Sequence, residues 1–155
     1  MVDRGRRSAP KGDFDMVRIR DDGVFDAPIE KLWKYIGDAP SHQHRAIQLG
    51  QPVNQKGNAM TFKAKALNPD GKTWRTETLV MTMNPPKGFS LETLDGPMKG
   101  TKHTHTYTAQ GEKTKVVVEG DFFMQGADEA ATRKGVLDYF AQTFAEDNAA
   151  LQKYK

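Results

Sequence analysis

The sequence predicts an α+β domain in which an antiparallel β-sheet is covered by one long C-terminal helix. Residues 48–125 read as consecutive strands separated by turn sequences rich in Gly, Pro, Asn and Asp. From Asp128 to Tyr154 there is no Pro, Gly135 is the only Gly, and apolar residues recur at three- and four-residue spacing. A long helix with one apolar stripe needs a broad apolar surface to lie on. The strands before it supply that surface.

Length and composition restrict the class of protein. At 155 residues the chain predicts one domain with a genuine core. It contains no Cys, which excludes disulfides, thiol chemistry and thiolate metal sites. No run approaches the ~20 apolar residues of a membrane span, and no apolar segment follows the basic N-terminus as a signal peptide requires. We therefore expect a soluble, cytoplasmic protein without integral membrane association.

Much of the net charge of +3 sits at the N-terminus. The basic residues there are Arg4, Arg6, Arg7 and Lys11. We predict a flexible basic tail over residues 1–14 and a single folded domain over residues 15–155. No basic stripe interleaved with aromatic residues follows the tail, so nucleic acid is not a predicted partner.

The first predicted elements are a strand and two short helices. Residues 16–24 begin with alternating apolar and charged side chains, which is typical of a strand. Pro28 at a first helical position predicts a helix start, and Gly37 ends that helix. Its expected buried side chains are Ile29, Leu32, Trp33 and Ile36. A second short helix is predicted over residues 41–47.

About six strands and the long helix follow. After a first strand from Gln48, the predicted strands are Ala59–Leu67, Trp74–Met83, Phe89–Leu94, Lys102–Ala109 and Thr114–Met124. Their spacing and short turns favour an antiparallel meander. The last helix begins with Asp128 as its N-cap and extends for roughly 40 Å. Its stripe comprises Leu137, Phe140, Ala141, Phe144 and Leu151, widened by Val136 and Tyr139.

Three local sequences and the element order carry a family resemblance. The sequences are Phe25-Asp-Ala-Pro-Ile-Glu-Lys-Leu-Trp, Pro85-Pro86, and Tyr107 followed by Gly111-Glu-Lys-Thr-Lys-Val. With them the chain resembles, over about residues 16–155, the SRPBCC superfamily: the helix-grip fold of START lipid-transfer domains, the major pollen allergen and the polyketide cyclase/dehydrase group. The resemblance implies a curved antiparallel sheet of about seven strands gripping the last helix, with a largely apolar cavity between them. Members bind lipids, sterols, polyketides, plant hormones or quinones, a minority catalyse cyclisation or dehydration, and the fold alone does not decide between these activities.

Period-two alternation predicts which side chains face that cavity. The inward residues of the last strand are Val116, Val118, Gly120, Phe122 and Met124, which we place against Phe140 and Phe144. The more apolar face of residues 74–83 carries Leu79, Met81 and Met83 together with Arg75 and Glu77. If this face is inward, the two charges need partners or water and could orient a polar ligand. The opposite orientation stays open, and it places Trp74, Thr76, Thr78, Val80 and Thr82 inside.

The strand sequence His103-Thr-His-Thr-Tyr places His103, His105 and Tyr107 on one face. Two imidazoles and a phenol in an apolar pocket could hold a carbonyl or phenolate, or move protons, because His titrates near neutral pH. The alternative is that these residues lie on the outer face or are satisfied polar residues of the core. Both alternatives stay open at this stage.

A second pair of histidines, His42 and His44, raises the question of a metal site. No carboxylate lies at a recognisable ligand spacing from either pair, and the superfamily does not generally require a metal. We therefore predict no metal and no cofactor, and expect His42 and His44 to cap or flank a short exposed helix. Phosphate-binding loops and Gly-x-Ser-x-Gly nucleophile sequences are absent from the sequence.

The leading hypothesis for function is the binding of a small hydrophobic ligand, such as a lipid, quinone or aromatic metabolite, by a monomer or homodimer. Burial would come from Leu79, Met81, Val116, Val118, Phe122, Phe140 and Phe144. His103, His105 and Tyr107, with Glu77 as a further candidate, would orient the polar end. The alternative is a cyclase/dehydrase-type enzyme in which His103 or His105 is the general base and Tyr107 or Arg75 stabilises the oxyanion. A third class is an adaptor that binds a protein through the cavity mouth.

Overall fold

In the part of the chain that the structure describes, seven antiparallel strands form one sheet in the order β2-β8-β7-β6-β5-β4-β3. They are β2 (Val17–Phe25), β3 (Ile47–Lys56), β4 (Ala59–Leu67), β5 (Trp74–Asn84), β6 (Gly88–Thr93), β7 (Lys102–Gln110) and β8 (Lys113–Phe122). Strands β3 to β8 follow one another as a meander, and the first described strand, β2, pairs with the last, β8. The computed structural model describes residues 16–38, 41–42, 44–68 and 70–154, the side chain of Gln51 excepted. The predicted basic tail lies outside these residues.

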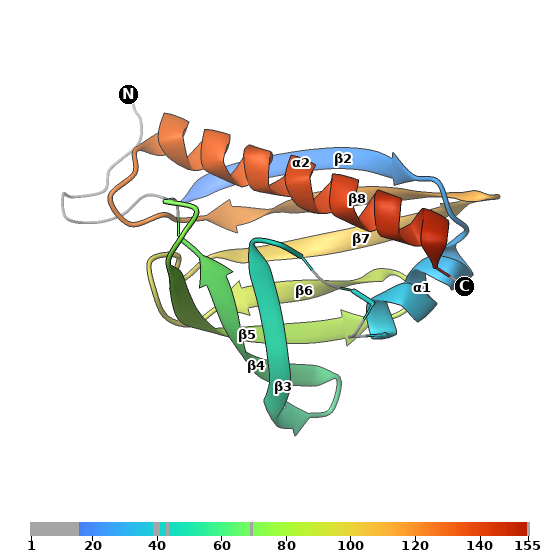
Figure 1. Cartoon of the computed structure of the whole chain (residues 1–155), viewed down its shortest axis with the longest axis horizontal. Helices are drawn as coiled ribbons and strands as arrows, with labels where there is room; N and C mark the ends of the chain where they lie inside the picture. Colours follow the sequence, from blue (N-terminus) through green and yellow to red (C-terminus); the bar gives the residue numbers. More distant parts are fainter. Residues whose placement is uncertain (1–15, 39–40, 43, 69, 155) are drawn as a thin grey trace.

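Two helices accompany the sheet, α1 (Ile29–Gly37) and α2 (Glu129–Lys153). The carboxylate of Asp128 caps α2 by accepting a hydrogen bond from the Ala131 amide at 2.8 Å, as the sequence predicts. In Figure 1, α2 crosses one face of the sheet beside β2, with α1 near its C-terminal end. Among the described strands, α2 makes its most extensive backbone contact with β2. Gly23 permits this approach, because a Cβ there would lie 2.8 Å from the Phe144 ring.

The predicted α+β class and helix-grip architecture are confirmed, but the prediction of a second short helix over residues 41–47 is wrong. Ser41 and His42 form a turn and a bend, His44–Ala46 are irregular, and Ile47 already belongs to β3. So short a segment is not a stable helix on its own. Its two imidazoles instead contact carboxylates of α2.

The core lies between α2 and the inward face of the sheet. The buried residues of α2 are Thr132, Val136, Phe140 and Leu151, with Leu137, Tyr139 and Phe144 half-buried. Ala141 is exposed, so its predicted place in the stripe is wrong. The buried stripe advances from Thr132 through Val136 to Phe140 in steps of four, and Ala141 stands one residue, about 100°, round the helix from Phe140.

One row of directly paired residues crosses the inward face of the sheet from β4 to β2. Met60, Met81, Leu91, His103, Gly120 and Ile19 are successive partners from β4 to β2. Directly paired residues share a face, so this row places His103 among apolar side chains. Gly120 lies directly opposite His103 and has no side chain to compete with the imidazole.

Gly120→Ala is expected to destabilise the domain by about 2 kcal/mol or more, because core overpacking typically costs ~1–3 kcal/mol. The added Cβ would lie 2.3 Å from the Lys102 carbonyl oxygen and 2.5 Å from the Cβ of His103, so the β7–β8 pair must move. Urea unfolding of the two proteins measures the difference. Gly37→Ala is the control, since a Cβ at Gly37 meets nothing within 4 Å. Equal losses in the two variants would contradict this account of Gly120.

Candidate ligand-binding site

The burial pattern of β5 decides which face of that strand is covered. Glu77, Leu79 and Met81 are buried, Arg75 is half-buried, and Trp74 and Thr76 are exposed. The first of the two orientations considered for β5 is therefore present. The other predicted apolar residues of the site also face inward. Val116, Val118, Phe122 and Phe140 are buried, and Phe144 is half-buried against Phe25, with ring centroids 4.8 Å apart.

The imidazole of His103 packs among aromatic rings. It stacks on Phe122 with centroids 5.1 Å apart, and Phe140 of α2 lies 6.2 Å away. The residue as a whole is half-buried, but its Nδ1 atom is buried and has no hydrogen-bond partner among the described residues. A buried polar atom without a partner costs about 1–3 kcal/mol, so native proteins retain few of them.

His105 and Tyr107 continue this polar row along β7. The His105 ring stacks on Phe89 at 4.5 Å and lies 5.1 Å from the His103 ring. Tyr107 is buried and meets Trp33 of α1 edge-on at 5.7 Å. The Trp33 indole donates a hydrogen bond to the Pro86 carbonyl at 3.1 Å, which ties α1 to the β5–β6 turn. The three predicted polar residues are thus side by side on the covered face.

Burial controls the charge state of this row. It lowers the pKa of His103 to about 4, and it lowers the pKa of His105 well below its usual value, with smaller contributions from the imidazoles of His103, His42 and His44. Burial, followed by the charge of Asp147, raises the pKa of Tyr107. At neutral pH the row is therefore uncharged: two imidazoles and a phenol that offer hydrogen bonds without net charge.

The charged residues of β5 are paired with one another. The Arg75 Nε donates to Glu77 Oε2 at 2.9 Å, and its Nη1 donates to Asn68 Oδ1 at 2.9 Å. Glu77 is four residues along β5 from Met81, which belongs to the same cross-strand row as His103. At about 3.3 Å per residue, this ion pair is a dozen ångströms along the sheet from that row. The ion pair satisfies the buried carboxylate of Glu77 and lies apart from the aromatic rings around His103.

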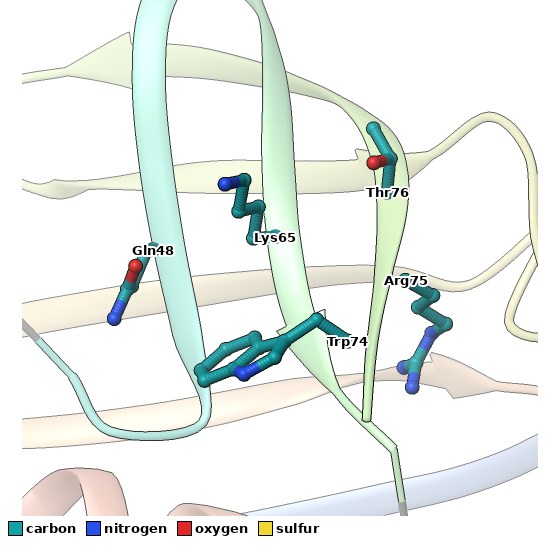
Figure 2. A pocket seen from close by; sticks show the side chains of 5 residues that line it. All are labelled: Gln48, Lys65, Trp74, Arg75 and Thr76. Carbon is teal, nitrogen blue, oxygen red and sulfur yellow. The ribbon is translucent and has the colours of Figure 1, made fainter. Parts of the chain in front are cut away.

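The side chains between the sheet and α2 include the buried residues Phe122, Val136 and Phe140. Two hollows lie elsewhere on the surface. One of about 440 Å³ is lined by Gln48, Lys65, Trp74, Arg75 and Thr76 on strands β3 to β5 (Figure 2). The other is lined by residues of β2, β7 and β8, among them Arg18, Lys102 and Glu119.

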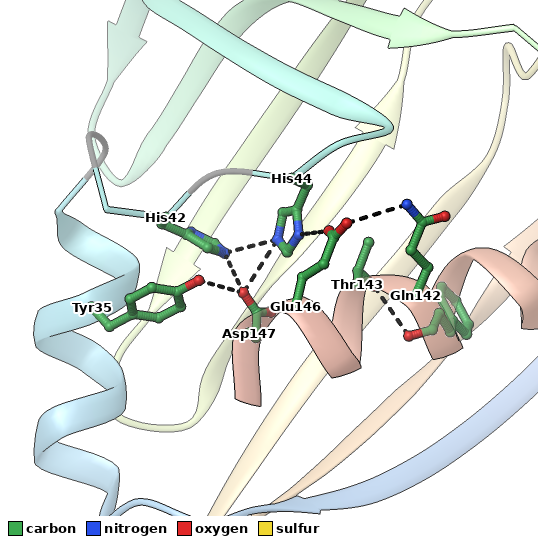
Figure 3. Close-up of polar contacts among 8 residues, drawn as sticks. Tyr35, His42, His44, Gln142, Thr143, Glu146 and Asp147 are labelled. Carbon is green, nitrogen blue, oxygen red and sulfur yellow. Dashed lines mark hydrogen bonds and ion pairs between the residues drawn. The ribbon is translucent and has the colours of Figure 1, made fainter. Parts of the chain in front are cut away.

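A second polar cluster joins the loop after α1 to α2 (Figure 3). The Nε2 atoms of His42 and His44 each lie 3.3 Å from Asp147 Oδ1, and His44 Nδ1 lies 2.8 Å from Glu146 Oε1. The expectation that these histidines cap or flank an exposed helix is wrong, because both are half-buried against α2. The sequence analysis missed Glu146 and Asp147, which are more than a hundred residues away and carry no spacing signal.

An antiparallel sheet that grips a long C-terminal helix, with a polar row on its covered face, defines a helix-grip domain of the SRPBCC superfamily. The family described as "Polyketide cyclase / dehydrase and lipid transport" matches residues 16–153. The chain belongs to this family. The comparison with curated protein sequences gives no match.

Solved structures with the same fold cover most of the chain. The Zhui aromatase/cyclase from Streptomyces sp. R1128 is 12% identical, with a TM-score of 0.66 over 88% of this chain and 91% of that chain. Ara h 8.0201 is 15% identical, with a TM-score of 0.69 over 89% and 99%. A START superfamily protein from Mycobacterium smegmatis is 8% identical, with a TM-score of 0.71 over 88% and 97%. At these identities the likeness shows the fold alone.

Within the described residues, no helix is both long and apolar enough to cross a membrane.

The lowered pKa of His103 predicts a loss of stability in mild acid. Between pH 6.5 and about 4 the unfolded chain binds a proton at His103 that the folded chain does not, so the free energy of unfolding falls as the pH falls through this window. The slope approaches ~1.4 kcal/mol per pH unit for each such histidine. His103→Phe, which keeps a flat ring beside Phe122, is expected to reduce the slope by about one proton. Urea unfolding at a series of pH values measures it, and an unchanged slope would show that His103 is not held neutral.

Proposed function

We propose that the protein binds a small, largely apolar ligand with a flat ring and at least one hydrogen-bonding group between the inward face of the sheet and α2. The buried Nδ1 of His103, which has no partner among the described residues, is the observation that carries the proposal. A hydroxyl or carbonyl of the ligand would supply that partner. The family description, which includes lipid transport, is consistent with a hydrophobic ligand.

The surroundings of His103 favour a ring-shaped ligand. Phe89, Phe122 and Phe140 present faces and edges toward the two imidazoles of β7. Flat rings pack among such groups in offset-stacked or edge-to-face arrangements, which add about 0.5–1.5 kcal/mol per pair beyond their buried area. Leu91 and Met81 continue the same cross-strand row and supply an adaptable apolar surface.

The charge state of the histidines supports binding over acid–base catalysis. A general base works best when its pKa is near the operating pH. The pKa of His103 is about 4 and that of His105 is also lowered, so neither imidazole holds an abstracted proton well at neutral pH. A cyclase or dehydrase reaction remains the second candidate on the strength of the family description, and it would need a substrate that raises one of these pKa values.

The adaptor hypothesis has less support, because the exposed apolar residues are divided between faces. Leu49 is paired with Ala64, which is buried on the inward face, whereas Trp74 belongs to the exposed residues of β5. Large exposed patches that bind proteins are contiguous. Leu49 and Trp74 do not form one.

The proposal predicts a specific ligand preference. 2-Naphthol, whose hydroxyl both donates and accepts, should bind about fivefold or more tightly than naphthalene, because a hydrogen bond to a buried group contributes about 1 kcal/mol net. In His103→Phe the preference should disappear, since the hydroxyl then has no partner. Equilibrium dialysis of both ligands against both proteins measures the four dissociation constants.

Two controls make the experiment decisive. Trp74→Phe changes an exposed aromatic residue that lines the hollow on strands β3 to β5 (Figure 2), and it should leave both affinities unchanged. Circular dichroism of His103→Phe checks that the fold is intact. If wild-type protein binds neither ligand, or prefers 2-naphthol equally with and without His103, the proposed site is wrong.

A further inference from the structure

Three ligand atoms converge where the loop after α1 meets α2. The Nε2 atoms of His42 and His44 are 3.2 Å apart, and each is 3.3 Å from Oδ1 of Asp147. These atoms therefore form a nearly equilateral triangle. The three side chains are only 12–20% exposed, so the triangle is shielded from bulk water on most sides.

The size of the triangle matches a metal coordination sphere. Zinc–ligand bonds to imidazole nitrogen and carboxylate oxygen are about 2.0–2.1 Å long, and a regular tetrahedron with such bonds has its ligand atoms about 3.3 Å apart. Octahedral coordination at the same bond length would bring neighbouring ligands to about 2.9 Å. The observed separations of 3.2 and 3.3 Å agree with the tetrahedral value.

Neighbouring side chains orient His44 and Asp147 through hydrogen bonds, as is common for metal ligands in proteins. His44 Nδ1 lies 2.8 Å from Glu146 Oε1, and a proton on Nδ1 that is donated to this carboxylate leaves the Nε2 lone pair facing the triangle. The Tyr35 hydroxyl donates to Asp147 Oδ1 at 2.8 Å and fixes the orientation of that carboxylate. In metal sites, a ligating histidine commonly donates its other N–H to a carboxylate, and a ligating carboxylate commonly accepts a hydrogen bond from a further residue.

Without a cation, the arrangement leaves few protons for its acceptors. With His44 neutral and its proton directed to Glu146, the His44 Nε2 lone pair and Asp147 Oδ1 share the one proton that His42 Nε2 can carry, and the other donor to Asp147 Oδ1 is the Tyr35 hydroxyl. These neutral donors leave the carboxylate without a paired cation, which is costly for a group shielded from water. A divalent cation at the centre would satisfy all three acceptors at once.

We propose that His42, His44 and Asp147 bind a divalent transition-metal ion in a three-ligand site with one open coordination position. Two imidazoles and one carboxylate are suited to zinc and its transition-metal neighbours, whereas magnesium and calcium favour oxygen ligands throughout. Tetrahedral sites with three protein ligands keep their fourth position for water or another small ligand. The inference does not depend on the proposed hydrophobic ligand.

The site links three elements that are distant in sequence. Tyr35 comes from α1, the histidines come from the following loop, and the carboxylates come from the last turns of α2 (Figure 3). A bound ion would therefore fasten the loop and α1 to the end of α2. The two histidines of the site also contribute to the lowered pKa of His105 in the polar row of β7.

Zinc binding by protein without a histidine tag tests the proposal. The protein is treated with EDTA, dialysed, and titrated with ZnCl2 in a calorimeter. We expect one ion per chain, and a rise in unfolding temperature with zinc concentration, because an ion that binds only the folded state stabilises it. Co(II) in place of zinc should give the intense visible bands of tetrahedral coordination.

Matched variants locate the ion. Asp147→Asn keeps the side-chain volume and an oxygen for the Tyr35 hydroxyl, and it should abolish both the Co(II) bands and the thermal shift. Glu146→Gln should weaken zinc binding by about 10–100-fold, as expected for a residue behind a ligating histidine. Asp138→Asn changes an exposed carboxylate of the same helix and should have no effect.

Each remaining result contradicts the proposal. If wild-type protein binds no zinc, the cluster is a hydrogen-bonded network only. If zinc binding survives both Asp147→Asn and His42→Ala, the ion occupies an adventitious site elsewhere. The naphthol experiment is unaffected by either outcome, so the two proposals can fail separately.

Discussion

The packing of α2 across the inward face of the sheet is the contact on which the rest of the structure depends. The sheet has one apolar face, formed by residues such as Ile19, Phe62 and Val118, and that face must be removed from water. Of the two described helices, α2, with 25 residues, is the longer and covers it. The close approach to β2 at Gly23, with Phe144 stacked on Phe25, sets where the helix lies.

Covering the sheet also determines the chemistry of everything beneath the helix. His103, His105 and Tyr107 would titrate near their ordinary values on an open sheet, but under α2 burial shifts the pKa of each toward the uncharged form. Glu77 tolerates the same burial only because Arg75 pairs with it. Among the described residues, His103 retains a buried side-chain atom without a hydrogen-bond partner, and its ring packs against those of Phe122 and Phe140.

The two polar regions of the molecule are electrostatically connected. Asp147, which faces His42 and His44, also raises the pKa of Tyr107, and the two histidines contribute to the lowered pKa of His105. A change of charge in the cluster at the end of α2 is therefore felt by the polar row of β7. In a low-dielectric interior such interactions extend further than at the surface.

The sequence by itself determined the strands, the long helix and the inward residues of β8, because these follow from local periodicity and turn chemistry. The Asp128 cap and the alternation of Val116, Val118 and Phe122 are examples. Tertiary structure decided the rest. The described residues of the segment 41–47 form no helix, and His42 and His44 instead contact carboxylates of α2. Ala141 is exposed because it lies about 100° round α2 from the buried Phe140. The meeting of His42 with Asp147 joins residues more than a hundred positions apart, and only the crossing of α2 over the sheet, fixed by packing, brings them together.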